Sequence, residues 1–208
     1  MRTKKIQIAG VFLALWGTAS ICMADDWLSP TKQTFYSENG RFAVTVVPKE
    51  LEGRRDPRAF FYAVGKDGQF QLSKAFKLVN EVAPVTALAS NDGRYLVTFD
   101  NWFSRGHGND TIVIYRTDGQ LIRSLSLEDV LTAEDIKALP RSVSSIHWGA
   151  EHYIDENSRV LVLRITRCAD LPPCSEKPAE VTINLADGMP LHPETWPPSI
   201  VVTISCQA

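Results

Sequence analysis

The sequence lacks the features that would assign it to several large classes of protein. It has no excess of basic residues, with 22 Lys and Arg against 24 Asp and Glu. A nucleic-acid-binding domain instead carries a basic stripe on a basic surface. The main apolar stretch near the start, residues 6–16, is interrupted by Gln7 and Gly10 and is shorter than the ~20 residues that span a membrane. We therefore expect no nucleic-acid partner and no transmembrane segment in the mature chain.

Motifs of the common catalytic sites are also missing. The sequence contains no Gly-x-Ser-x-Gly, no His-Glu-x-x-His, no phosphate-binding loop and no dinucleotide fingerprint. A catalytic triad assembled from distant residues stays open, because geometry rather than spacing defines it. We predict no cofactor, no metal and no assigned catalytic residue.

Residues 1–24 have the pattern of a signal peptide. Arg2, Lys4 and Lys5 precede the apolar stretch, and small residues lead to Ala24, where a signal peptidase can cut. A membrane anchor and lipid attachment through Cys22 are the alternatives, although the bulky Ile21 disfavours the second. The mature chain, residues 25–208, then carries 19 basic and 24 acidic residues, a balance of −5. We expect one β-rich domain in the periplasm or outside the cell.

Cysteine is scarce, with four residues in the whole chain, and three of them follow the predicted cut. Because export leads to an oxidising compartment, we predict a disulfide between Cys168 and Cys174. A metal site is the alternative, but no Cys-x-x-Cys spacing supports it. Redox chemistry is disfavoured because reactive dithiols usually lie closer together. Cys206 could be free, pair between chains or replace one of the other two.

A phrase of ten residues occurs twice. Residues 37–46 and 90–99 both read Ser, two polar residues, Gly-Arg, an aromatic residue and then an apolar run. Glycine allows the positive φ of a tight turn, and Asn or Asp tolerates the neighbouring position. The phrase therefore predicts a hairpin in each copy. Arg41 and Arg94 recur at the same place, which favours a repeated structural role.

A companion phrase follows each copy, in which an apolar strand enters an Asp-Gly turn. The turns are Asp67-Gly68 and Asp118-Gly119, 51 residues apart, while Gly40 and Gly93 are 53 apart. Matched hairpins at matched intervals indicate an internal repeat. A third, divergent copy is predicted over residues 145–191, where a turn at Asp187-Gly188 survives but the Gly-Arg phrase does not.

One segment departs from the β pattern. Ser126 and Thr132 can each begin a helix, and Pro140 ends whatever forms. We predict one or two short helices over residues 127–139.

The two hairpin phrases resemble those of WD40-like and TolB-like β-propeller blades. The resemblance is clear over residues 34–125 and partial in the third unit, and a middle segment is also similar to uncharacterised secreted bacterial proteins. It implies an all-β fold of three blade-like antiparallel meanders, in an incomplete or small propeller. Closed propellers have four to eight blades, so a β-sandwich is the alternative. The resemblance implies no particular activity.

The most unusual loop spans residues 100–110, between two predicted strands. As a binding site it would offer a stacking indole, a histidine and carboxylates; as a structural loop its polar groups would satisfy the turn backbone. The predicted binding residues are Asp100, Asn101, Trp102, Arg105, His107 and Asp110. His147 and His152 could join His107 around a metal ion, but we expect Trp148 to lie in the core and both histidines to be surface or capping groups.

We therefore hypothesise an exported, non-enzymatic binding or scaffold protein whose sheets present loops to a protein or cell-envelope partner. The alternative is a hydrolase or metal-dependent enzyme that uses His107 with Asp100, Asp110 or His152. A third possibility is a structural envelope component, which would show a large apolar patch.

Overall fold

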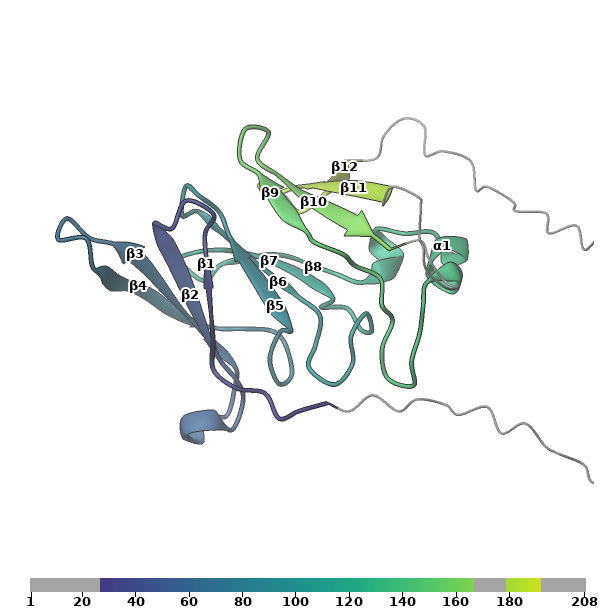
Figure 1. The fold of residues 1–208 in the computed structure, drawn as a ribbon, viewed down its shortest axis with the longest axis horizontal. Helices are drawn as coiled ribbons and strands as arrows, with labels where there is room; N and C mark the ends of the chain where they lie inside the picture. The colour runs from purple at the N-terminus through teal and green to yellow at the C-terminus, as the bar shows by residue number, and fades with distance from the viewer. Residues whose placement is uncertain (1–26, 167–178, 192–208) are drawn as a thin grey trace, which may run out of the picture.

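The computed structural model describes residues 27–166 and 179–191. Twelve strands form three four-stranded antiparallel sheets, and in each sheet the strands follow one another in chain order. Figure 1 shows the first sheet at one end of the molecule, the second in the middle and the third at the other end. The prediction of three antiparallel meanders in an all-β fold is confirmed.

The strands have the following bounds. The first sheet contains β1 (Gln33–Tyr36), β2 (Phe42–Val47), β3 (Arg58–Val64) and β4 (Phe70–Lys77). The second contains β5 (Thr86–Ala89), β6 (Tyr95–Phe99), β7 (Ile112–Arg116) and β8 (Leu121–Leu125). The third contains β9 (Tyr153–Asp155), β10 (Val160–Ile165), β11 (Ala179–Asn184) and β12 (Pro190–Leu191). A 3-10 turn, η1 (Leu51–Gly53), lies between β2 and β3.

The first hairpin of every sheet has the same loop length. Paired residues on either side of the turn are seven positions apart in all three: Tyr36 with Ala43, Ala89 with Leu96, and Ile154 with Leu161. This register aligns Arg159 with Arg41 and Arg94, an equivalence that the sequence pattern missed. The reason is a local shift in the turn. Gly40 and Gly93 have φ of 68° and 70°, whereas the third turn places its positive φ one residue later, at Arg159 (55°).

The three arginines share a main-chain role. Each carbonyl accepts a hydrogen bond from an N–H at the end of the third strand of its sheet: Val64 to Arg41 (2.9 Å), Thr117 to Arg94 (3.0 Å) and Leu185 to Arg159 (3.3 Å). Arg41, Arg94 and Arg159 therefore occupy equivalent positions in the three sheets.

The second hairpin repeats in all three sheets as well. The aspartate of each Asp-Gly turn accepts a hydrogen bond from the N–H two residues later, at 3.1 Å for Asp67, 3.0 Å for Asp118 and 2.9 Å for Asp187. Such side-chain-to-backbone bonds stabilise the turn locally. All three predicted Asp-Gly turns are confirmed.

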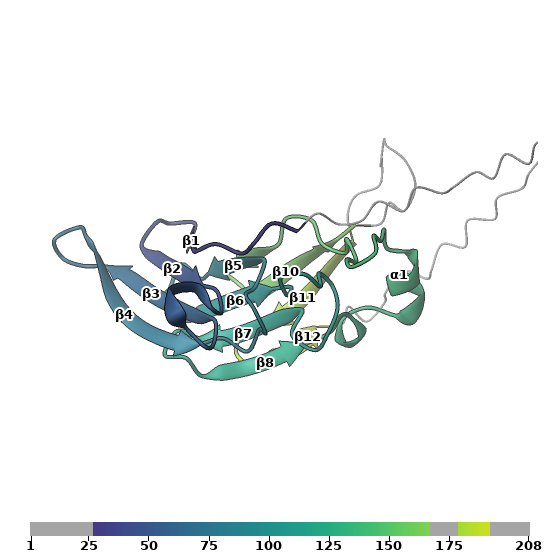
Figure 2. The same ribbon diagram turned by 90° about the horizontal axis from the view of Figure 1, so that it is seen from below.

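The second sheet is the centre of the core. Every residue of β6 is buried, because its two faces contact different sheets. One face packs with Val44, Phe61 and Phe76 of the first sheet, and the other with Leu161 and Ile183 of the third. Figure 2 shows the same succession of sheets from below. Within the described residues the sheets do not close into a ring.

The helical insertion lies where the sequence predicts it. The 3-10 turn η2 (Leu127–Asp129) begins at Ser126, whose side chain and main chain both bond Asp129. The helix α1 (Ala133–Ala138) begins at Thr132, which accepts from the Asp135 N–H at 3.2 Å. Their apolar side chains, including Leu127 and Ile136, join the core between the second and third sheets.

The predicted signal peptide, residues 1–24, and the three cysteines Cys168, Cys174 and Cys206 lie outside the described residues. In the part of the chain that the structure describes, no helix has the length and apolarity needed to cross a membrane.

Candidate functional site

The first predicted site residue, Asp100, faces inward. It follows β6 with φ of 59°, a left-handed conformation that aspartate tolerates better than most residues. Its carboxylate accepts hydrogen bonds from the Gly106 N–H (2.8 Å), the Trp148 indole (2.8 Å) and the Arg105 guanidinium (3.2 Å). Burial raises the pKa of this carboxyl, and the three donors, which lower it, offset only part of that effect. Asp100 thus holds the loop against the third unit.

Asn101 and Asp110 tie the two ends of the loop together. The Asn101 side-chain N–H₂ donates to Asp110 Oδ1 at 2.8 Å, and Asn101 Oδ1 accepts from the Asn80 amide at 2.9 Å. Asn80 also donates to the Asp100 carbonyl at 3.1 Å. These bonds satisfy polar groups that the fold buries.

The remaining loop residues lie nearer the surface. The Trp102 indole donates to the Leu28 carbonyl at 2.8 Å and its ring lies 5.7 Å from that of Trp27. His107 is exposed, and its main-chain N–H bonds the Ser104 carbonyl. Across residues 27–166 and 179–191, no group of three His, Cys, Asp or Glu side chains is placed to hold a metal ion.

His152 is stacked between two aromatic rings. Its centroid lies 4.7 Å from both Phe99 and Trp148, and Nδ1 accepts from the Arg164 N–H at 3.2 Å. Burial, reinforced by the nearby Arg105 charge, lowers the pKa of His152 to about 4. The imidazole is therefore neutral at pH 7, with its proton on Nε2. His147 is exposed, His152 is half-buried and caps the Arg164 main-chain N–H, and Trp148 is fully buried. The expectation of a core tryptophan with surface or capping histidines is therefore confirmed.

A partly open cavity of about 570 Å³ lies beside His152, between the second and third sheets. All three units contribute to its lining. The first unit supplies Glu38, the second supplies Thr86, Leu88 and Phe99, and the third supplies Ala150, Glu151, His152, Tyr153 and Arg164. β5 and β9, the first strands of their sheets, supply opposite walls.

The cationic side chain in the cavity wall, Arg164, already contacts two other side chains. Arg164 Nε lies 3.2 Å from Glu180 Oε1, and its guanidinium carbon lies 5.0 Å from the centre of the Tyr153 ring. None of the predicted loop residues lines this cavity, and of the residues that do, the sequence analysis singled out His152 alone. The link is indirect: Asp100 bonds Trp148, and Trp148 stacks on His152.

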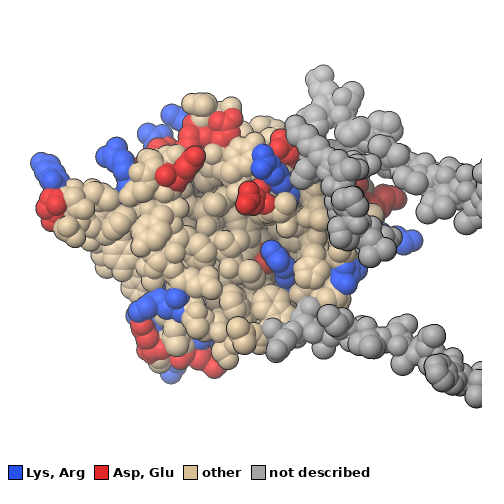
Figure 3. Space-filling model, in the orientation of Figure 1, with Lys and Arg blue, Asp and Glu red and all other residues tan. Residues whose placement is uncertain are grey.

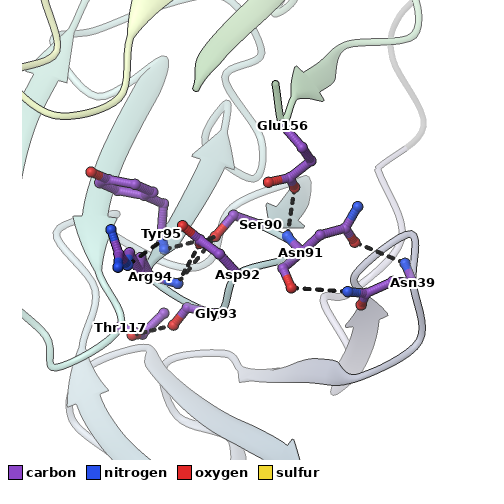
Figure 4. A network of polar contacts seen from close by, with 9 residues as sticks. All are labelled: Asn39, Ser90, Asn91, Asp92, Gly93, Arg94, Tyr95, Thr117 and Glu156. Atoms are coloured by element: carbon purple, nitrogen blue, oxygen red, sulfur yellow. Dashed lines mark hydrogen bonds and ion pairs between the residues drawn. The ribbon is translucent and has the colours of Figure 1, made fainter. Parts of the chain in front are cut away.

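Turns of the three sheets meet beside this cavity. Figure 4 shows Asn91 at the centre, with its main-chain N–H bonded to Glu156 and its side-chain oxygen accepting from the Asn39 N–H. The Asn39 amide donates in turn to the Asn91 carbonyl at 2.9 Å. Burial, followed by repulsion from neighbouring carboxylates, raises the pKa of Glu156. One polar network thus connects all three units.

Comparison with protein-family models and with curated proteins finds no match to this chain.

Proposed function

We propose that this is an exported binding protein that holds a small ligand in the cavity between its second and third sheets. The observation that carries the proposal is the cavity itself. Its lining combines apolar and aromatic side chains with polar and charged ones, and a ligand pocket uses both kinds of group. A neutral His152, fixed by two rings and one main-chain N–H, suits a rigid wall better than proton transfer near pH 7.

A thermal-shift screen tests this function. The processed protein is screened against amino acids, sugars, organic acids and alkylammonium ions, and a ligand at 100 times its Kd stabilises the fold by about 2.7 kcal/mol. Ala150→Trp places an indole in the cavity mouth and should abolish the shift. Ala138→Trp, at an exposed position of α1, should retain it. A shift that persists unchanged in Ala150→Trp contradicts the proposed site.

The proposal includes export, a periplasmic or extracellular location and the bridge between Cys168 and Cys174. The repeated hairpins support a relationship to propeller blades of the WD40-like and TolB-like kind. Intact-mass measurement of the processed protein, with and without reduction before alkylation, tests the cut after Ala24 and the bridge together. A mature protein with three free thiols contradicts the bridge.

A further inference from the structure

The cavity has an unbalanced charge. Its lining carries two carboxylates, Glu38 and Glu151, and one guanidinium, that of Arg164. The guanidinium is shared with Glu180, which lies next to the lining. Because His152 is neutral at pH 7, it adds no positive charge. The wall therefore has a net negative charge before any ligand binds.

The neighbouring turns carry charges of both signs, because Arg41, Arg94 and Arg159 belong to them and Arg94 lies 3.6 Å from Asp92. The excess of negative charge therefore comes from the lining itself. Glu38 lies in the cavity lining and also close to Glu156. The carboxylates of Glu38, Asp92 and Asp155 all repel the Glu156 carboxylate. Figure 3 shows acidic and basic side chains side by side along the upper edge of this face. A cleft with a net negative charge attracts cations, although here the Arg164 guanidinium offsets part of that charge.

The uncharged part of the lining limits the kind of cation. Leu88 and Phe99 give the second-sheet wall, and Tyr153, which is 39% exposed, gives an aromatic surface on the third. The Arg164 guanidinium already contacts this ring, with its carbon 5.0 Å from the ring centre, so the attraction to a bound cation comes mainly from the carboxylates. The apolar lining favours a weakly hydrated cation that carries alkyl groups. A divalent metal ion needs a shell of oxygen ligands, and no group of three suitable side chains is placed to hold one in the described chain.

We propose that the cavity binds an organic cation, an ammonium group carried on a small apolar framework. The inference rests on the proposed function and names the class of its ligand. Glu38 and Glu151 supply the attraction, the apolar wall holds the alkyl part, and the neutral His152 Nε2–H leaves the field negative at pH 7.

Titration calorimetry with charged and neutral ligands of the same shape tests the class. Choline, tetramethylammonium and butylammonium are titrated into the processed protein, and 3,3-dimethylbutan-1-ol serves as the neutral counterpart of choline. We expect at least one ammonium ion to bind, and the neutral counterpart of choline to bind at least ten-fold more weakly than choline. The Glu38→Gln, Glu151→Gln double variant should weaken ammonium binding at least ten-fold, while Glu128→Gln, on the exposed turn η2, leaves it unchanged.

The outcomes separate the two proposals. Binding that is blocked by Ala150→Trp but does not prefer cations overturns the ligand class and keeps the cavity as the site. Ammonium binding that survives the double glutamate variant also overturns the class. If no compound of the thermal-shift screen or the titrations binds, the proposed function fails together with the inference.

Discussion

The rings of Trp148 and His152 stack with their centroids 4.7 Å apart and an interplanar angle of 22°. Trp148 is fully buried, and its indole N–H donates to Asp100. The imidazole at the cavity wall is therefore held by a tryptophan that is itself held by the loop at residues 100–110. A change in that loop reaches the cavity through two contacts.

Asp100→Ala should destabilise the fold by about 2–4 kcal/mol. The substitution leaves two buried donors, the Gly106 N–H and the Trp148 indole, without an acceptor, at ~1–3 kcal/mol each. Asp100→Asn keeps one side-chain oxygen and tolerates the positive φ, so it should cost less than half as much. Urea unfolding measures both. His107→Ala is the control within the same loop, expected to change stability by less than about 0.5 kcal/mol because His107 is exposed.

His152 should make the protein less stable in mild acid. Its pKa is about 4 in the fold against 6.5 as a free side chain, so the unfolded state binds more protons between these values. The contribution of His152 to the free energy of unfolding is fully present above pH 6.5 and is lost as the pH decreases, at ~1.4 kcal/mol per pH unit. At pH 5 the loss is about 2 kcal/mol.

The check is the free energy of unfolding at pH 7.5 and pH 5 in wild type and His152→Gln. Asp100 and Glu156 oppose the trend, because their raised pKa values make the folded state bind the extra proton. The difference between the two proteins removes that contribution. A His152→Gln variant with the same pH dependence as wild type contradicts the prediction.

Gly40→Ala and Gly93→Ala should differ although they change the same turn position. Both glycines have φ near 70°, so both variants lose roughly 1 kcal/mol from the left-handed backbone. A Cβ at Gly40 meets nothing within 4 Å, whereas at Gly93 it would lie 2.3 Å from the Phe42 ring. Displacing that ring adds about 1–3 kcal/mol. Thermal denaturation of the pair gives the comparison, and equal losses would show that Phe42 moves aside freely.

Glu156→Gln should be slightly stabilising at pH 7. The charged carboxylate is disfavoured in the fold, while a Gln oxygen can still accept from the Asn91 N–H. Because the side chain is only half-buried, solvent screening limits the gain to a few tenths of a kcal/mol. The gain should vanish at acidic pH, where Glu156 is protonated in wild type too. Chemical unfolding at pH 7 and pH 4 tests this, and a gain that grows in acid contradicts it.

Local patterns predicted the sheets because each hairpin is determined by its own turn. Gly68 and Gly119 provide the positive φ, and Asp67 and Asp118 satisfy the turn backbone, so the phrase alone predicts the structure. The same logic failed at Arg159, because a one-residue shift of the positive φ removed the glycine that marks the turn.

The cavity could not be predicted in this way. Glu38, Leu88 and Tyr153 come from three units that the chain separates by about 50 residues or more, and each has an ordinary strand or turn context. Asp100 and His152 were noticed for their chemistry, but the packing around Trp148 decides that one is buried and the other neutral.

Among residues 27–166 and 179–191, the sheets form a row in which only the middle one has a neighbour on both faces. Units coupled only to their neighbours can open from the ends, as in linear repeat proteins. Amide hydrogens of β6 and β7 should therefore exchange most slowly, while the first and third sheets exchange through partial opening of the row. The cavity lies at one of these two junctions, so a bound ligand would slow amide exchange in the third sheet more than in the first.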